Sequence, residues 1–106
     1  MAIARSMIYE AYADWAERYA ERAELRARHA RDHAVTALRH ADQEATRGDT
    51  EIESLHRREA ELHARAAACH DQAAACQRGR AAVLRTGIGV ETVRKEHPLR
   101  RVAKAP

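Results

Sequence analysis

Imidazole side chains recur at helical spacings in this 106-residue chain, which contains seven histidines. His29 and His33 lie one helical turn apart in the first half, and His56 and His63 lie one heptad apart in the second half. Imidazole is a common ligand of transition metals, and two histidines four residues apart on a helix can chelate one ion. These residues are therefore candidate metal ligands. The alternative is that they fill space beside a helix–helix seam.

Three glutamates extend this candidate metal site. Glu44 lies shortly before residues 47–49, and after them Glu53-x-x-His56 is followed by Glu59 and His63. A glutamate from one helix with Glu-x-x-His from its neighbour resembles half of the site in ferritin-like di-iron bundles, and a second copy would supply the other half. The resemblance implies iron, whereas histidines also suit zinc or copper. The alternative is an open bundle end with solvated carboxylates, because Glu44 and Glu53 lie beside a predicted turn.

A column of alanines must position these residues. From about residue 5 to residue 46 the chain has no glycine or proline and is rich in Ala, Glu and Arg, which predicts one long helix. Nine alanines in it follow alternating steps of three and four residues, the period of a left-handed coiled-coil seam. They are Ala13, Ala16, Ala20, Ala23, Ala27, Ala30, Ala34, Ala37 and Ala41. Because alanine is small, a partner helix is expected near the low end of the range of roughly 8–10 Å between helix axes.

Residues 47–49 predict a turn, because Gly48 suits the left-handed position after a helix. Thr50 and Glu53 then form a capping box, which predicts a second helix over about residues 50–86 with Thr50 as its cap. That helix is expected to end before Gly87 and Gly89. Its own three–four repeat predicts its seam and places both cysteines in the core. The seam residues are Ile52, Leu55, Glu59, Leu62, Ala66, Cys69, Ala73, Cys76, Arg80 and Val83.

So short a turn requires the helices to pack antiparallel, with residue i level with roughly residue 96 − i. His33, which we expect to be buried, is then level with His63, but on the opposite side of the seam, so only a dimer would join the histidine columns.

Further alanine columns at 60/67/74/81 and 68/75/82 flank the seam. An alanine hairpin alone buries little apolar area at about 25 cal/mol per Å². The predicted fold is all-α: an alanine-rich antiparallel hairpin over residues 1–88 that dimerises into a four-helix bundle.

Basic charge is concentrated in the last thirty residues. Residues 1–76 hold 11 arginines and 14 acidic residues (net −3), whereas residues 77–106 hold 8 basic residues and 2 glutamates (net +6), which together give the net charge of +3. Residues 89–106 are therefore treated as a basic C-terminal segment that docks an acidic partner or, alternatively, nucleic-acid phosphates. The predicted contact residues are Arg78, Arg80, Arg85, Arg94, Lys95, Arg100, Arg101 and Lys104.

The sequence predicts a cytoplasmic protein without a membrane partner, because it has neither a signal-peptide core nor a long apolar run. Cys69 and Cys76 are then expected to be reduced thiols. No nucleotide-binding loop or catalytic triad pattern is present in the sequence. The predicted function is that of a non-enzymatic homodimeric scaffold or adaptor without a cofactor. The two alternatives are a nucleic-acid-binding hairpin dimer and a bundle that binds a transition metal such as Fe, Zn or Cu.

Overall fold

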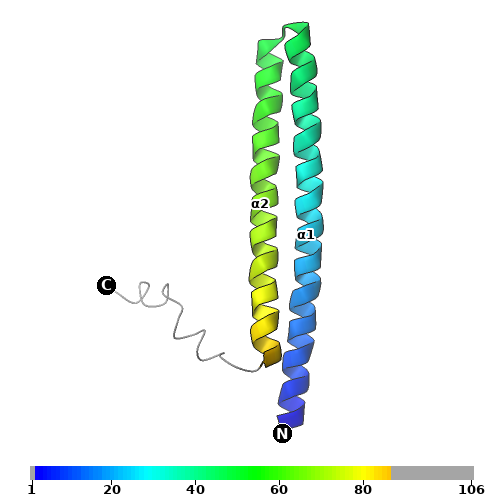
Figure 1. Cartoon of the computed structure of the whole chain (residues 1–106), viewed down its shortest axis with the longest axis vertical. Coiled ribbons are helices and arrows are strands. Elements are labelled where there is room, and N and C mark those ends of the chain that lie inside the picture. The colour runs from blue at the N-terminus through cyan, green and yellow to red at the C-terminus, as the bar shows by residue number, and fades with distance from the viewer. Residues whose placement is uncertain (1, 87–106) are drawn as a thin grey trace, which may run out of the picture.

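The computed structural model describes residues 2–86, which form two long α-helices. α1 spans Ala2–Arg47 and α2 spans Thr50–Thr86. Figure 1 shows the helices side by side and antiparallel, with the turn at one end of the hairpin and the N-terminus at the other. This confirms the predicted all-α hairpin. The predicted basic segment, residues 89–106, lies outside the described residues.

The end of α1 is closed by Gly48, as predicted. Gly48 has a φ of 81°, in the left-handed region that glycine adopts without a Cβ penalty. Its N–H donates to the carbonyl of Ala45 at 3.1 Å, and the N–H of Asp49 donates to the carbonyl of Glu44 at 3.0 Å. Two carbonyls at the end of α1 therefore have partners within the turn.

The cap of α2 differs from the predicted capping box. Asp49, and not Thr50, is the cap: its Oδ1 accepts a hydrogen bond from the N–H of Ile52 at 3.1 Å. The Glu53 side chain accepts a hydrogen bond from Arg57 at 2.9 Å and does not complete the box. An aspartate is as good a cap as a threonine or better, so the residue that directly precedes the first helical turn takes the role.

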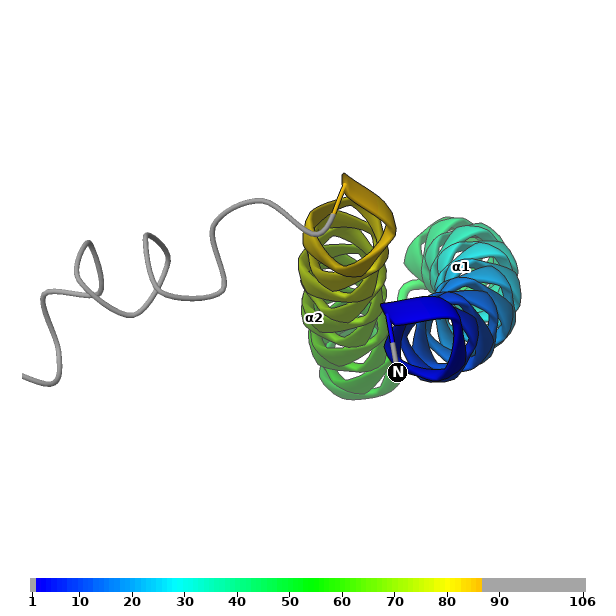
Figure 2. The ribbon, with the colours of Figure 1, turned by 90° about the horizontal axis from the view of Figure 1, so that it is seen from below.

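The core between the helices is built from alanine alone. Among the described residues every buried side chain is an alanine, and nine of these twelve alanines form three-residue layers with two members from α1 and one from α2. The clearest layers are Ala13/Ala16/Ala81, Ala20/Ala23/Ala74 and Ala27/Ala30/Ala67. The predicted α1 seam is therefore confirmed, with Ala34 half-buried. Figure 2, along the hairpin, shows the two helices inclined in opposite directions, as expected for a supercoil.

The seam of α2 lies one residue away from the predicted one. The buried column is Ala60, Ala67, Ala74 and Ala81. In contrast, Leu55 and Leu62 of the predicted seam are 61% and 58% exposed. Cys69 and Cys76 are exposed as well. One residue corresponds to about 100° around a helix with 3.6 residues per turn, so a different face of α2 meets α1.

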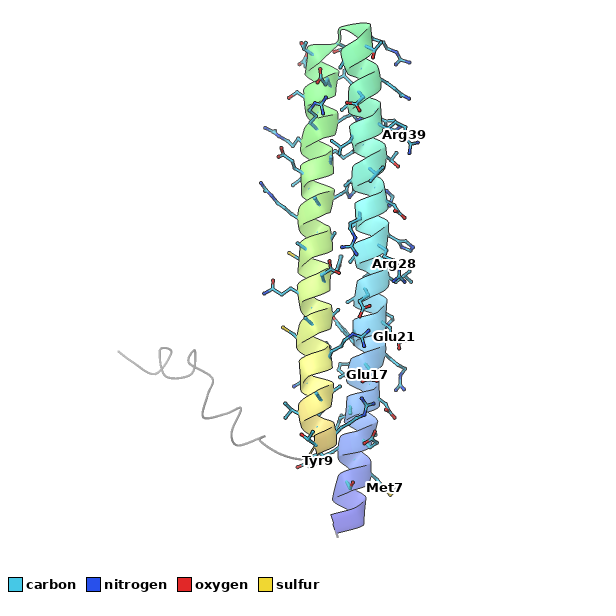
Figure 3. All side chains as sticks on the ribbon, viewed as in Figure 1. Met7, Tyr9, Glu17, Glu21, Arg28 and Arg39 are labelled. Atoms are coloured by element: carbon cyan, nitrogen blue, oxygen red, sulfur yellow. The ribbon has the colours of Figure 1, made fainter. Side chains whose placement is uncertain are left out.

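The physical reason for this difference is side-chain size. The buried column and the predicted seam recur with the same seven-residue period, so the period alone does not choose between these two faces of α2. An alanine column on α2 lets the two backbones approach, whereas Glu59, Leu62 and Arg80 would hold them apart. Close packing of alanine on alanine therefore selects the column that the sequence analysis had placed on the flank. Figure 3 shows the long side chains, such as Arg28 and Arg39 of α1, projecting outward from this seam.

Candidate functional site

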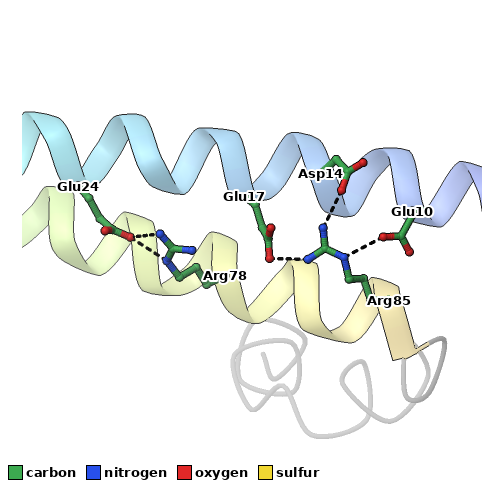
Figure 4. Close-up of polar contacts among 6 residues, drawn as sticks. All are labelled: Glu10, Asp14, Glu17, Glu24, Arg78 and Arg85. Carbon is green, nitrogen blue, oxygen red and sulfur yellow. Dashed lines mark hydrogen bonds and ion pairs between the residues drawn. The ribbon is translucent and has the colours of Figure 1, made fainter.

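The hairpin has two unlike flanks, and the first is charged. Figure 4 shows Arg85 of α2 surrounded by three carboxylates of α1. Its guanidinium donates to Asp14 at 2.7 Å, to Glu10 at 2.9 Å and to Glu17. Hydrogen bonds to Glu17, Glu10 and Asp14 raise the pKa of Arg85 above its ordinary value. We call this flank the charged face.

The same charged face continues along the hairpin. Arg78 donates to Glu24 at 2.7 Å, and Arg31 pairs with Asp71 at 2.6 Å. The Glu24 carboxylate raises the pKa of Arg78 through a hydrogen bond and through its charge. These side chains are exposed, so each pair contributes little stability. Together they join oppositely charged positions of the two helices, with the acidic residue on α1 for Arg78 and Arg85 and on α2 for Arg31, and so favour one alignment of the helices.

Two of the predicted partner-binding arginines are held within this charged face. Arg78 and Arg85 bind carboxylates of α1. Arg80 lies on the opposite flank, beside Tyr12 and Leu84, and has no ion pair within residues 2–86. The other five, Arg94, Lys95, Arg100, Arg101 and Lys104, lie outside the described residues. Contact with an acidic partner through these residues stays a prediction.

The second flank is apolar and is open to solvent. It carries the α2 stripe, which we define as the ten residues from Ile52 to Val83 that the sequence analysis had assigned to the seam. Its large members remain uncovered: Ile52 is 40% exposed, Leu55 61% and Leu62 58%. Ala66 and Ala73 are half-buried, because they also pack against the edge of the alanine core.

At the end near the N-terminus, α1 contributes aromatic side chains to this flank. Ile8, Tyr12, Trp15 and Tyr19 are spaced by four, three and four residues, so they follow one line along α1. Tyr12 and Trp15 are 59% and 46% exposed, and the rings of Trp15 and Tyr19 lie 5.7 Å apart. A groove of about 610 Å³ opens here, lined by Ala11, Tyr12, Trp15, Arg18, Arg80 and Leu84. We call the α2 stripe, these aromatic residues and the groove together the apolar face.

The histidines meet within one hairpin, contrary to the prediction that they lie on opposite sides of the seam. The rings of His33 and His63 are stacked, with centroids 5.1 Å apart and planes inclined by 26°, and the ring centroids of His40 and His56 are 5.3 Å apart. Both pairs are level as predicted. They touch because the shift of the α2 seam moves His56 and His63 from its flank into the contact face. His33 itself is exposed, so the expected burial is wrong.

Two of the three carboxylates of the candidate metal site pair with arginines. Glu44 pairs with Arg47 at 2.9 Å, and Glu53 pairs with Arg57 at 2.9 Å. Glu59 lies 3.9 Å from His56, while the exposed His29 takes part in neither histidine pair. Within residues 2–86 no group of three or more His, Cys, Asp or Glu side chains is placed to hold one ion. The closest arrangement of candidate ligands is therefore the two histidine pairs.

The charged face was missed by the sequence analysis, although it has a sequence signal. Glu10, Glu17 and Glu24 are spaced by seven residues, as are Arg78 and Arg85. Opposite charges at heptad spacing on two antiparallel helices indicate pairing across a coiled-coil seam. Reading the two helices together would have placed these residues beside one another.

Within the described residues, neither helix combines the length and the apolar character that a bilayer span requires. Comparisons of the chain with protein-family models, with curated proteins and with solved structures found no match.

Proposed function

We propose that this protein is a homodimeric helical-hairpin scaffold that associates through its apolar face. The observation that carries the proposal is the uncovered three–four repeat along α2, with Leu55 61% exposed and Leu62 58% exposed. Contiguous apolar patches of this kind mark interaction sites on soluble proteins. Fully burying one leucine contributes about 1.5–3 kcal/mol, which the alanine seam cannot gain from its own small side chains.

A second copy suits this face better than an unrelated protein. One chain presents both a row of projecting side chains and the groove beside Tyr12 and Trp15, so two copies can fill each other's groove. Such a contact is isologous, with the same patch on both subunits, and closes at a dimer. Two hairpins joined in this way make the predicted four-helix bundle.

The dimer is tested by sedimentation equilibrium of the purified full chain. We expect a mass of about twice the 11.9 kDa of the chain at micromolar concentration. Leu62→Lys should shift the protein to monomer, because it places a charge in the contact. Ala68→Lys is the matched control: Ala68 is exposed and lies on neither face. A helical wild-type monomer would contradict the proposal.

The basic segment supplies the docking part of the proposed function. Arg78 and Arg85 are already paired with carboxylates, so we assign contact with an acidic protein partner mainly to residues 89–106. Deleting these residues should leave the helices and the dimer unchanged and abolish binding. A strongly salt-dependent affinity of the intact chain for any duplex or RNA would instead favour the nucleic-acid alternative.

A second candidate function is favoured by the histidine pairs. We infer that a zinc, copper or nickel ion can bridge His33 and His63, whose rings lie 5.1 Å apart, because neutral imidazoles are ligands of these metals. Zinc should then raise the thermal midpoint of protein purified without a histidine tag. His63→Ala should abolish that rise. His29→Ala should retain it, and loss of the effect in His29→Ala would assign the ion to the His29/His33 pair on α1.

A further inference from the structure

We propose that the two hairpins pair with their α2 helices antiparallel, so that the twofold axis crosses the α2 stripe between Ala66 and Cys69. This inference rests on the dimer proposed above and adds its orientation and its register. Three features of the apolar face support it: the two charges within the stripe, the distribution of large side chains, and the position of the groove.

The stripe contains only two charged residues, and they have opposite signs. Glu59 lies in the half near the turn, and Arg80 lies in the half near the end of α2. In a parallel pair, Glu59 would face the partner's Glu59 and Arg80 would face the partner's Arg80. In an antiparallel pair, Glu59 lies about one turn from the partner's Arg80, within reach of its long side chain, and the contact occurs twice. Like charges across an interface are unfavourable, so the charges select the antiparallel orientation.

The sizes of the side chains select the same orientation. Large aliphatic residues, Ile52, Leu55 and Leu62, lie in the half of the stripe near the turn, whereas the centre holds Ala66 and Cys69. The aromatic residues and the groove lie at the opposite end of the hairpin. An antiparallel pair brings the leucine-rich half of each copy to the groove of the other. A parallel pair would set groove against groove and leave the space unfilled, which costs packing energy.

The register follows from the length of the stripe. Every stripe residue faces another stripe residue when opposing residue numbers sum to 135, which pairs Ile52 with the partner's Val83 and Leu55 with the partner's Arg80. Leu55 and Ile52 then reach the level of the groove lined by Tyr12, Trp15 and Leu84. The small residues Ala66 and Cys69 meet at the axis, where the two α2 helices can approach closely.

The distances between the two copies of Cys69 and between the two copies of Cys76 distinguish this arrangement from others. Both are exposed on the stripe. At 1.5 Å per residue, the two copies of Cys69 lie about 5 Å apart along the axis in the proposed register, whereas the two copies of Cys76 lie about 25 Å apart. In a parallel pair each cysteine would instead lie beside its own copy.

Thiol crosslinking of the full-length protein with a short bismaleimide therefore tests the inference. We expect Cys76→Ser, which retains Cys69, to be crosslinked into a dimer, and Cys69→Ser, which retains Cys76, to stay uncrosslinked. Equal crosslinking of both variants would overturn the antiparallel orientation. A dimer in sedimentation without crosslinking through Cys69 would overturn the register but not the proposed scaffold. A monomer in sedimentation would overturn both.

Charge exchange provides a second test that does not use the cysteines. Glu59→Arg and Arg80→Glu should each weaken dimerisation on the order of tenfold, because two attractive contacts become repulsive. The double variant should restore the wild-type dissociation constant. Glu61→Arg is the control, since Glu61 is exposed and lies outside the stripe. If neither single variant changes the dissociation constant, Glu59 does not face the partner's Arg80 and the proposed pairing is wrong.

Discussion

Replacing Ala67 with leucine tests the α2 seam directly. Ala67 is 2% exposed and packs in one layer with Ala27, which is 0% exposed, and Ala30, which is 8% exposed. An isobutyl group has no room between the two backbones, so the helices must separate or the side chain must leave its preferred rotamer. Overpacking of this kind costs about 1–3 kcal/mol. For a chain of this size the thermal midpoint should fall by roughly 4–24 °C, at about 4–8 °C per kcal/mol.

The matched control is the same substitution one residue later. Ala68 is exposed, so Ala68→Leu has the same change in helix propensity but meets no opposing side chain. Its effect should stay within about 0.5 kcal/mol. The assay is circular dichroism melting of both variants at one protein concentration, because the proposed dimerisation would make the midpoint concentration-dependent. Equal midpoints for Ala67→Leu and Ala68→Leu would refute the assignment of the 60/67/74/81 column to the seam.

Two further substitutions test the turn and the charged face. Asp49→Ala should cost about 1 kcal/mol in chemical denaturation, because it removes the cap of α2, whereas Thr50→Ala should have little effect; the opposite ranking would restore the predicted capping box. Arg85→Gln should lower the thermal midpoint at low salt and lose most of that effect at high salt, because its contacts with α1 are exposed and screened. Arg65→Gln is its control, since Arg65 is exposed and makes no ion pair within residues 2–86. An Arg85→Gln midpoint equal to that of wild type at low salt would mean that the charged face does not hold the helices together.

Much of the fold is predictable from the sequence, because the composition of the helices and the glycine of the turn indicate the same structure. The absence of glycine and proline before Gly48, and the left-handed φ of Gly48 itself, set the two helices and the turn. The shortness of the turn then sets the antiparallel arrangement and the levels, as the contact of His33 with His63 confirms. The helices, the turn and the antiparallel arrangement each depend on residues that are close together in the chain, so a single sequence is enough to predict them.

The face of α2 was not predictable from its period, because two stripes on α2 share that period. Which of these two faces packs against α1 depends on the size of the side chains that meet. The alanine seam of α1 packs closely against the column of Ala60, whereas the bulkier stripe that contains Leu62 would hold the helices apart. The same shift of one residue explains why the histidine pairs were predicted at the right level but on the wrong side. The same shift changes which face is left for a second copy to cover. The alanine column of α2 is buried against α1, and the residues that remain exposed are the large aliphatic and aromatic side chains of the apolar face.

The central claim, that a second copy covers the apolar face, is tested most directly by the reactivity of the native thiols. Cys69 and Cys76 are exposed in the single hairpin, and both lie on the α2 stripe. We predict that the rate of thiol modification by a soluble reagent falls as protein concentration rises through the dimerisation range, while helicity stays constant. A modification rate that stays the same at every protein concentration, and that matches the rate in the Leu62→Lys variant, would show that the stripe remains open and would contradict the claim.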